Sequence, residues 1–340
     1  MHASSPLIRL GWNHRRAREL SAPGAAGAVP ARIARVDRGG GLAIAEDGEV
    51  AVRGEGLAVG DWVALRGDAV AAVLPRRSTL SRRGAGRATA EQVIAANVDV
   101  VLVVQGLDRP LRLRRIHRAL VMAWDSGATP AVVLTKADLA AAAQVEALLA
   151  DAALGVDIHT VSVVAGRGVD EIAARAAPAR TVVLLGESGA GKSSLANALI
   201  GREALPTGAV RDGDARGRHT TTARHLIALP GGGALIDTPG VRELGLWGAE
   251  RGLARAFDDI ETLAEGCRFR DCRHESEPGC AVLAAVASGE LDPGRLQSLR
   301  DLRRELAADE RRRDERASRA AGRRGSRAAR QALRVKGRRP

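Results

Sequence analysis

The chain has 340 residues, of which 45% are apolar and 27% charged, a composition typical of a folded protein with room for two or three domains. No apolar run reaches the roughly 18–20 residues of a membrane span, and residues 1–16 lack a secretion signal, so we expect a cytoplasmic protein without membrane contact. The formal net charge is +12, and most of it lies in residues 295–340, where 17 Arg or Lys face 6 Asp or Glu.

That basic segment has two interpretations. It is either a solvated helix with a frayed basic end or a nucleic-acid contact, which gains from the release of phosphate counterions, and we favour the contact. The chain also has 49 Arg but only three Lys, at positions 136, 192 and 336. Two of these Lys lie inside motifs described below. There a compact ammonium group on a flexible stem can reach around phosphates or lie across a loop, which a planar guanidinium group cannot do equally well.

Residues 1–28 show no periodicity and form a predicted N-terminal extension. Over 29–80, short alternating runs separated by Gly or Asp recur about every ten residues, which predicts a five-stranded β-barrel of the OB-fold type. Such barrels often bind RNA, but only Trp62 offers an aromatic face for stacking, so a purely structural barrel is the alternative. A basic, Gly-containing linker over 76–87 follows.

Residues 81–245 are predicted to form an α/β domain, because β-branched apolar runs alternate with helical segments. Runs of this kind are typical of strands buried on both faces of a parallel sheet. The predicted strands are 97–107, 131–134, 156–163 and 181–185, and the predicted helices are 111–126, 139–153 and 169–177.

The segment GESGAGKSS matches the phosphate-binding pattern G-x-x-x-x-G-K-[ST] fully, with a strand before it and a helix-forming segment after it. Backbone N–H groups of such a loop converge on phosphate oxygens, Lys192 reaches the β- and γ-phosphates, and the Ser193 hydroxyl ligates Mg²⁺. A chance Gly-rich turn is the alternative. The predicted nucleotide contacts in this loop are Gly186, Glu187, Ser188, Gly189, Ala190, Gly191, Lys192, Ser193 and Ser194.

The segment ALIDTPG supplies the second element of a nucleotide site. Asp237 ends a predicted strand and is expected to hold the magnesium shell, while the Gly240 N–H is expected to sense the γ-phosphate. DTPG alone is a weak signal, but its place downstream of a phosphate-binding loop makes it a strong one.

The segment TKAD follows a predicted strand and is typical of guanine recognition. The Asp138 carboxylate is expected to accept hydrogen bonds from guanine N1 and N2, which adenine does not supply, with the Lys136 stem over the base plane. Four letters also arise by chance, but a strand stands before TKAD and another after it. The predicted contacts are Thr135, Lys136, Ala137 and Asp138, with Ser162 and Val163 after the next strand.

The guanine element precedes the phosphate-binding loop, which reverses their usual order in GTPases. We interpret this as a rotation of the chain order, with the break placed after DTPG and the segment 169–180 joining the old termini. Whatever follows DTPG is therefore attached directly to a nucleotide-sensing segment.

All three cysteines lie in CRFRDCRHESEPGC. An odd number of cysteines in a cytoplasmic chain disfavours a disulfide framework. Three thiolates and one imidazole can complete a tetrahedral Zn²⁺ shell without an open position, so we expect a structural zinc in a helical domain over 246–310, followed by an Arg-rich tail over 311–340. Buried free thiols are the alternative. The predicted ligands are Cys267, Cys272, His274 and Cys280.

Together these motifs strongly resemble the circularly permuted GTPases, in particular the small-subunit-dependent GTPases of the RsgA or YjeQ type, over residues 29–300. The resemblance implies GTP hydrolysis stimulated by the small (30S) ribosomal subunit, contact with its 16S rRNA, and a role late in subunit maturation. It also implies that His219 of GRHTTT assists catalysis, because Val241 stands where many GTPases have a water-orienting Gln. A solvent-exposed loop histidine is the alternative.

The resemblance has limits and competitors. Thr135 stands where GTPases commonly have Asn, and SV replaces SA at 162–163, changes that we expect to loosen guanine binding. The motifs leave open which of Thr220–Thr222 closes on magnesium. We expect a monomeric GTP hydrolase with one structural Zn²⁺ and nucleotide-bound Mg²⁺. The alternatives are an RNA-binding module whose nucleotide site senses but barely hydrolyses, and a P-loop ATPase or kinase.

Overall fold

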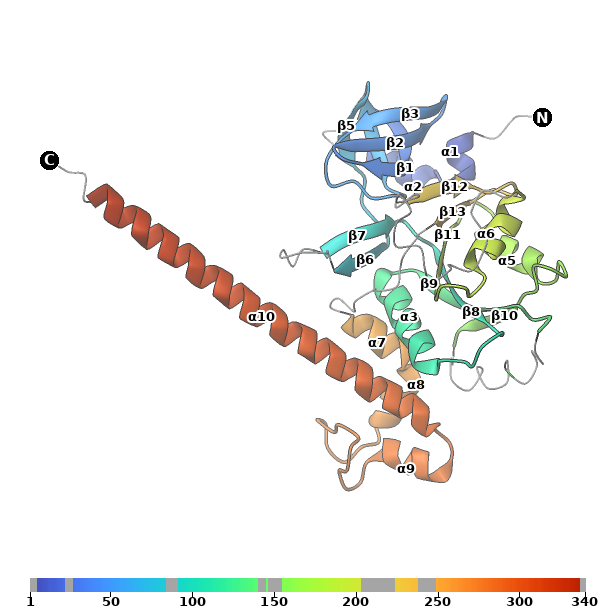
Figure 1. Cartoon of the computed structure of the whole chain (residues 1–340), viewed down its shortest axis with the longest axis vertical. Coiled ribbons are helices and arrows are strands. Elements are labelled where there is room, and N and C mark those ends of the chain that lie inside the picture. The colour runs from blue at the N-terminus through green and yellow to red at the C-terminus, as the bar shows by residue number, and fades with distance from the viewer. Residues whose placement is uncertain are drawn as a thin grey trace, which may run out of the picture.

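The computed structural model describes residues 5–21, 27–83, 91–139, 145, 155–202, 224–237 and 249–336. An N-terminal barrel, a central sheet with helices on both faces and a C-terminal helical unit follow one another along the chain (Figure 1). Among the described residues, none of the helices is both long and apolar enough to span a membrane.

The barrel closes as predicted. Strands β1 to β5 are hydrogen-bonded in the order β1-β2-β3-β5-β4, and β4 pairs back to β1. All pairings are antiparallel except β3 with β5, which meet at Arg53 and Ala69. The interior is apolar and includes Ile33 and Val63. The strands are β1 (Val29–Asp37), β2 (Gly40–Ala45), β3 (Gly48–Arg53), β4 (Trp62–Arg66) and β5 (Ala69–Val73).

Trp62 does not present the stacking face that the sequence allowed for. Its side chain is only 2% exposed, its ring centroid lies 5.1 Å from that of Trp12, and the guanidinium of Arg32 lies 5.0 Å from the ring centroid. The indole therefore belongs to the junction between the barrel and the neighbouring elements.

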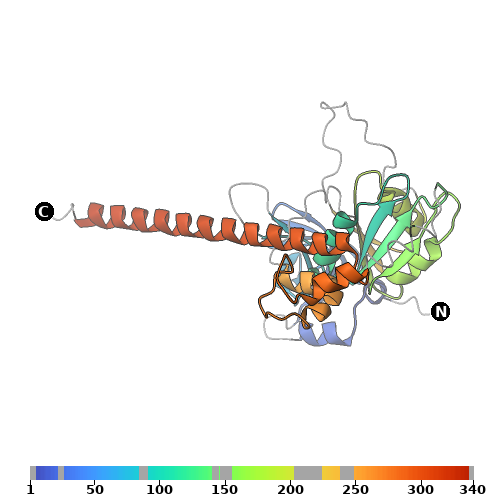
Figure 2. The ribbon, with the colours of Figure 1, turned by 90° about the horizontal axis from the view of Figure 1, so that it is seen from below.

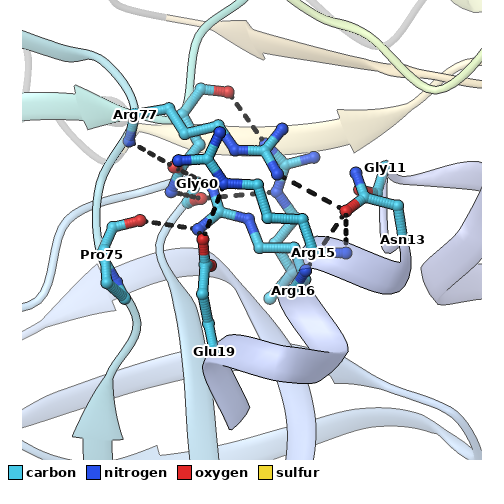
Figure 3. A network of polar contacts seen from close by, with 10 residues as sticks. Gly11, Asn13, Arg15, Arg16, Glu19, Gly60, Pro75 and Arg77 are labelled. Carbon is cyan, nitrogen blue, oxygen red and sulfur yellow. Dashed lines mark hydrogen bonds and ion pairs between the residues drawn. The ribbon is translucent and has the colours of Figure 1, made fainter.

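The stretch in which the sequence predicts no element contains two short helices that dock on this junction. The Asn13 side chain accepts hydrogen bonds from the backbone N–H groups of Arg15 and Arg16, which caps the second helix. The buried Arg16 side chain donates to the Pro75 carbonyl oxygen at 2.6 Å and to a Glu19 carboxylate oxygen at 2.7 Å (Figure 3). The helices are α1 (Pro6–Arg9) and α2 (His14–Leu20).

The central sheet has the strand order β10-β9-β8-β11-β13-β12. The first five strands are parallel, as predicted, whereas the edge strand β12 is antiparallel to β13. Through β12 the sheet continues into the barrel, where His225 pairs with Arg35 of β1. The strands are β8 (Val100–Gly106), β9 (Thr129–Thr135), β10 (Asp157–Thr160), β11 (Thr181–Gly186), β12 (His225–Ala228) and β13 (Ala234–Asp237).

A separate pair of antiparallel strands, β6 (Thr79–Arg83) and β7 (Glu91–Ala96), lies below the barrel and beside the central sheet (Figure 1). It begins inside the segment that the sequence suggests is a linker. Part of that basic segment is therefore ordered as a strand.

Successive residues of the central strands point to opposite faces of the sheet and enter two different apolar cores. Because both faces are apolar, helices cover both of them. One core joins the sheet to α3, and the other joins it to α5 and α6. The helix predicted over 139–153 lies mostly outside the described residues. The described helices are α3 (Leu113–Ser126), α5 (Val169–Ala176) and α6 (Lys192–Ile200).

The C-terminal unit is helical, as predicted, and packs on α3. Gly252 of α7 lies so close to α3 that an added Cβ would be 2.1 Å from the Val121 carbonyl oxygen. Helix α10 projects away from the body of the molecule in both views (Figures 1 and 2). Its buried leucines are Leu296, Leu299, Leu302 and Leu306. The helices are α7 (Glu250–Ala256), α8 (Asp258–Ala264), α9 (Ala281–Ser288) and α10 (Pro293–Lys336).

Candidate nucleotide site and metal centre

The phosphate-binding motif forms the turn between β11 and α6, the strand–loop–helix context that the sequence predicts. At Gly186 an added Cβ would lie 2.2 Å from the Val104 carbonyl oxygen, so only glycine fits beside the neighbouring strand. Gly191 has φ +87°, and a Cβ there would lie 3.0 Å from Thr135 Oγ1. The loop is therefore held close to two neighbouring strands.

Lys192 closes this loop. Its Nζ donates to the carbonyl oxygens of Gly186 at 2.8 Å and Glu187 at 2.5 Å. Asp237 is the last residue of β13, which pairs in parallel with β11. The predicted magnesium ligand and the phosphate-binding loop therefore both lie at the carboxyl ends of the strands. Burial raises the pKa of Asp237, while nearby His225 and Lys192 oppose that rise.

The predicted guanine element lies at the same edge. Thr135 is the last residue of β9, and its Oγ1 donates to the Ala190 carbonyl oxygen at 2.5 Å. The residue that the sequence marks as a departure from Asn thus forms a direct hydrogen bond to the phosphate-binding loop. Lys136 follows in the left-handed region, at φ 59°.

Ser162 holds the candidate guanine-reading carboxylate. Its Oγ donates to Asp138 Oδ1 at 2.6 Å and thereby lowers the pKa of Asp138. The Ser162 side chain is buried, and its backbone pairs with Arg167 in a tight turn. The neighbouring Val163 packs partly against the core under α5 and α6. The structure therefore brings together the two segments that the sequence could only place in order.

Two charged residues at this site were missed by the sequence interpretation. Asp108 and Arg109 lie one residue beyond the end of β8, and Asp108 Oδ2 accepts a hydrogen bond from Lys136 Nζ at 2.7 Å. Arg109 donates to the Ser188 carbonyl oxygen at 3.2 Å. Their position after a buried parallel strand was the available signal, because ligands bind beyond the carboxyl ends of such strands.

Three predicted participants lie outside the described residues: the candidate catalytic residue His219, the segment Thr220–Thr222 and Gly240. Their roles stay predictions. Among the described residues, the candidate nucleotide site consists of the phosphate-binding loop, the predicted guanine element with Ser162, and Asp237.

The four predicted zinc ligands lie together in the C-terminal unit. One ligand atom from each residue lies within 4.8 Å of the other three. The Cys267 and Cys280 sulfurs are 3.8 Å apart, and His274 Nδ1 lies 3.6 Å from Cys267 Sγ and 3.4 Å from Cys280 Sγ. Tetrahedral zinc requires about 3.8 Å between two sulfurs and about 3.6 Å between sulfur and nitrogen. The donor set and its spacing therefore fit a metal ion.

Comparisons with known proteins agree on one family. Residues 73–247 match the family model described as RsgA GTPase. A protein of Streptomyces avermitilis named small ribosomal subunit biogenesis GTPase RsgA is 47% identical over 320 residues, covering 89% of this chain and 86% of that protein. A protein of Opitutus terrae with the same name is 50% identical over 267 residues, covering 78% and 72%.

Two solved structures share the arrangement. YjeQ from Thermotoga maritima aligns with a TM-score of 0.63 at 25% identity, covering 82% of this chain and 98% of that one. YloQ, described as a circularly permuted GTPase, aligns with a TM-score of 0.60 at 25% identity, covering 85% and 98%. With a guanine element ahead of the phosphate-binding loop in one parallel sheet, this chain belongs to the RsgA GTPase family.

Proposed function

We propose that the chain binds GTP with Mg²⁺ and hydrolyses it to GDP and phosphate, under stimulation by the small ribosomal subunit, late in that subunit's maturation. The observation that carries this proposal is the convergence of three segments at one sheet edge. In the bound state, Asp138, held by Ser162, would contact the base, Lys192 and the loop amides would contact the phosphates, and Asp237 would contact the metal.

The chain's own residues have defined tasks in this proposal. Lys192, which donates to two carbonyl oxygens in the structure, would instead contact the β- and γ-phosphates of bound GTP. Ser193 and Asp237 would hold Mg²⁺, which would supply positive charge beside the phosphates. His219 orients the attacking water, the role that the family resemblance implies. We expect a slow intrinsic rate in the absence of the subunit.

The four-ligand cluster holds one structural Zn²⁺ in this proposal. The spacing of its sulfur and nitrogen atoms supports a closed tetrahedral shell, which would leave no position for a reacting water. The metal would connect the loop 267–280 to the start of α9. It would therefore stabilise the C-terminal helical unit, which follows Asp237 in the chain.

We further propose that the protein is a cytoplasmic monomer that contacts 16S rRNA with its C-terminal unit. The sequence of α10 supports the RNA contact, because this helix is rich in Arg and projects from the body of the molecule. The zinc-site loop adds Phe269, which is 42% exposed and lies beside Arg268 with 5.5 Å from guanidinium to ring centroid. An exposed aromatic ring flanked by arginines suits an unpaired RNA base.

Measuring GTP turnover with and without purified small ribosomal subunits tests this function. We expect slow turnover alone and marked stimulation by the subunits, with ATP left unhydrolysed. Lys192→Ala should lose nucleotide binding while its circular dichroism spectrum stays unchanged. Absence of stimulation would overturn the enzyme proposal in favour of an RNA-binding module that senses nucleotide without appreciable hydrolysis.

A further inference from the structure

We propose that Asp108 is a positioning residue for guanine nucleotides, and that with Arg109 and Lys136 it forms an ionic clamp between the guanine element and the phosphate-binding loop. This inference rests on the proposed function, because it concerns the same site. It adds two residues that lie outside every motif of the sequence.

The first arm of the clamp holds Lys136. The Lys136 ammonium lies 2.7 Å from Asp108 Oδ2, and the backbone of Lys136 is in the left-handed region that lysine rarely adopts. Gly106 leaves room for this contact, since an added Cβ there would lie 2.6 Å from Asp108 Oδ1. The carboxylate thus folds back over the end of β8 and fixes the direction of the lysine.

The second arm reaches the phosphate-binding loop. Arg109 donates to both carboxylate oxygens of Asp108, each at 3.3 Å, and to the Ser188 carbonyl oxygen at 3.2 Å. At Gly189, which has φ +77°, an added Cβ would lie 3.0 Å from an Arg109 guanidinium nitrogen. Arg115 of α3 forms an ion pair with Glu187 on the same loop. The Asp108 carboxylate therefore contacts Lys136 directly and is linked through Arg109 to Ser188 of the phosphate-binding loop.

The clamp runs beside a second link between the same two segments, the buried hydrogen bond from Thr135 to the Ala190 carbonyl oxygen. The buried link sets the separation of the segments. The partly exposed ionic link orients Lys136, whose stem is expected to lie over the base plane when a nucleotide binds. Pre-orienting Lys136 removes part of the entropy cost of nucleotide binding.

This position predicts a specific signature. The clamp acts at the base end of the nucleotide and not at the γ-phosphate, so GTP and GDP should be affected equally and kcat at saturating GTP should not change. It acts through Lys136 rather than Asp138, so the preference for GTP over inosine triphosphate should persist. Because the side chains are about a quarter to a third exposed, the expected loss of affinity is about fivefold.

The test uses the full chain with Asp108→Asn, which keeps the side-chain shape and removes its charge. Titration calorimetry with GTP and with GDP should show equal losses of about fivefold. Asp108→Glu should restore part of the affinity. Asp157→Asn is the matched control, because it removes a carboxylate paired with Arg175 at 2.6 Å at the amino end of β10, away from the carboxyl ends where the clamp lies, and it should bind as the wild type does.

A double substitution completes the test. In a Lys136→Met background, Asp108→Asn should have no further effect, whereas additive losses would overturn the inference. An unchanged affinity of Asp108→Asn would overturn it as well, as would a lower kcat with unchanged KM. A wild-type chain that binds neither GTP nor GDP would instead refute the proposed function, so the two failures are distinguishable.

Discussion

Cys280 has two tasks that a pair of substitutions separates. Its Sγ accepts a hydrogen bond from the Leu283 backbone N–H at 3.4 Å and so caps the N-terminus of α9. The same atom lies 3.8 Å from Cys267 Sγ and 3.4 Å from His274 Nδ1, as a proposed zinc ligand. Cys280→Ser keeps a capping oxygen but loses the soft thiolate, whereas Cys280→Ala loses both.

Both variants should lose the metal, and the alanine variant should lose about 1 kcal/mol more stability through the missing cap. The loss of metal is the larger effect, since zinc binding to four-ligand sites of zinc-finger peptides is worth about 10–16 kcal/mol and is coupled to folding. The assay is elemental analysis of zinc per chain, combined with thermal unfolding followed by circular dichroism.

A chelator should lower the unfolding temperature of the wild type to that of Cys280→Ser and should leave the variant unchanged. The reasoning would be refuted if Cys280→Ser kept one zinc per chain, or if the chelator did not affect the wild type.

The remaining predictions concern the nucleotide site and the RNA surface. Ser162→Ala removes the donor that holds Asp138, so GTP and GDP affinities should fall together; calorimetry checks this, and a selective loss of GTP would contradict it. Hydrogen bonds from Lys136 and Arg109 lower the pKa of Asp108 to about 2, so the clamp is lost only as the pH falls through about 2. Because the carboxylate stays ionised above about pH 4, the ratio of wild-type to Asp108→Asn affinity should stay constant from about pH 5 to 8. Phe269→Ala should weaken binding to small subunits, with Phe269→Trp close to the wild type; equal losses in a sedimentation assay would exclude stacking. Removal of residues 311–340 should lower the salt dependence of subunit binding, and an unchanged slope would mean that the tail is a solvated extension.

The parts of the fold that sequence reasoning anticipated are those with strong local constraints. Buried parallel strands read as continuous β-branched runs, and the phosphate-binding loop needs glycines at fixed spacing, as the close contact of Gly186 with Val104 illustrates. The cluster that could hold a metal ion was predictable because four side chains of suitable chemistry lie within fourteen positions.

The missed features depend on contacts between distant residues. Helix α2 is too short to be stable alone and is held by Arg16, which reaches Pro75 across the fold. Strand β12 has only four residues, and its antiparallel pairing follows from its neighbours in the sheet. The role proposed for Asp108 depends on its contact with Lys136, which is 28 positions away in the chain.

Thr135 has a structural role that its interpretation from the sequence did not include. From the sequence, threonine in place of asparagine suggests a looser guanine site. In the structure, the hydroxyl of this buried residue donates to the Ala190 carbonyl oxygen at 2.5 Å and connects the guanine element to the phosphate-binding loop. The shorter side chain reaches that oxygen because Gly191, without a side chain, lets the two segments approach.

The central claim is that Asp138 reads guanine, and the most direct test is the nucleotide preference of Asp138→Asn. The carboxylate accepts hydrogen bonds from guanine N1 and N2, whereas the amide of asparagine can donate to the oxygen that xanthine carries in place of N2. The wild type should prefer GTP to both ATP and xanthosine triphosphate, and the variant should prefer xanthosine triphosphate to GTP. A wild type that binds ATP as tightly as GTP, or a variant whose preference is unchanged, would contradict the account.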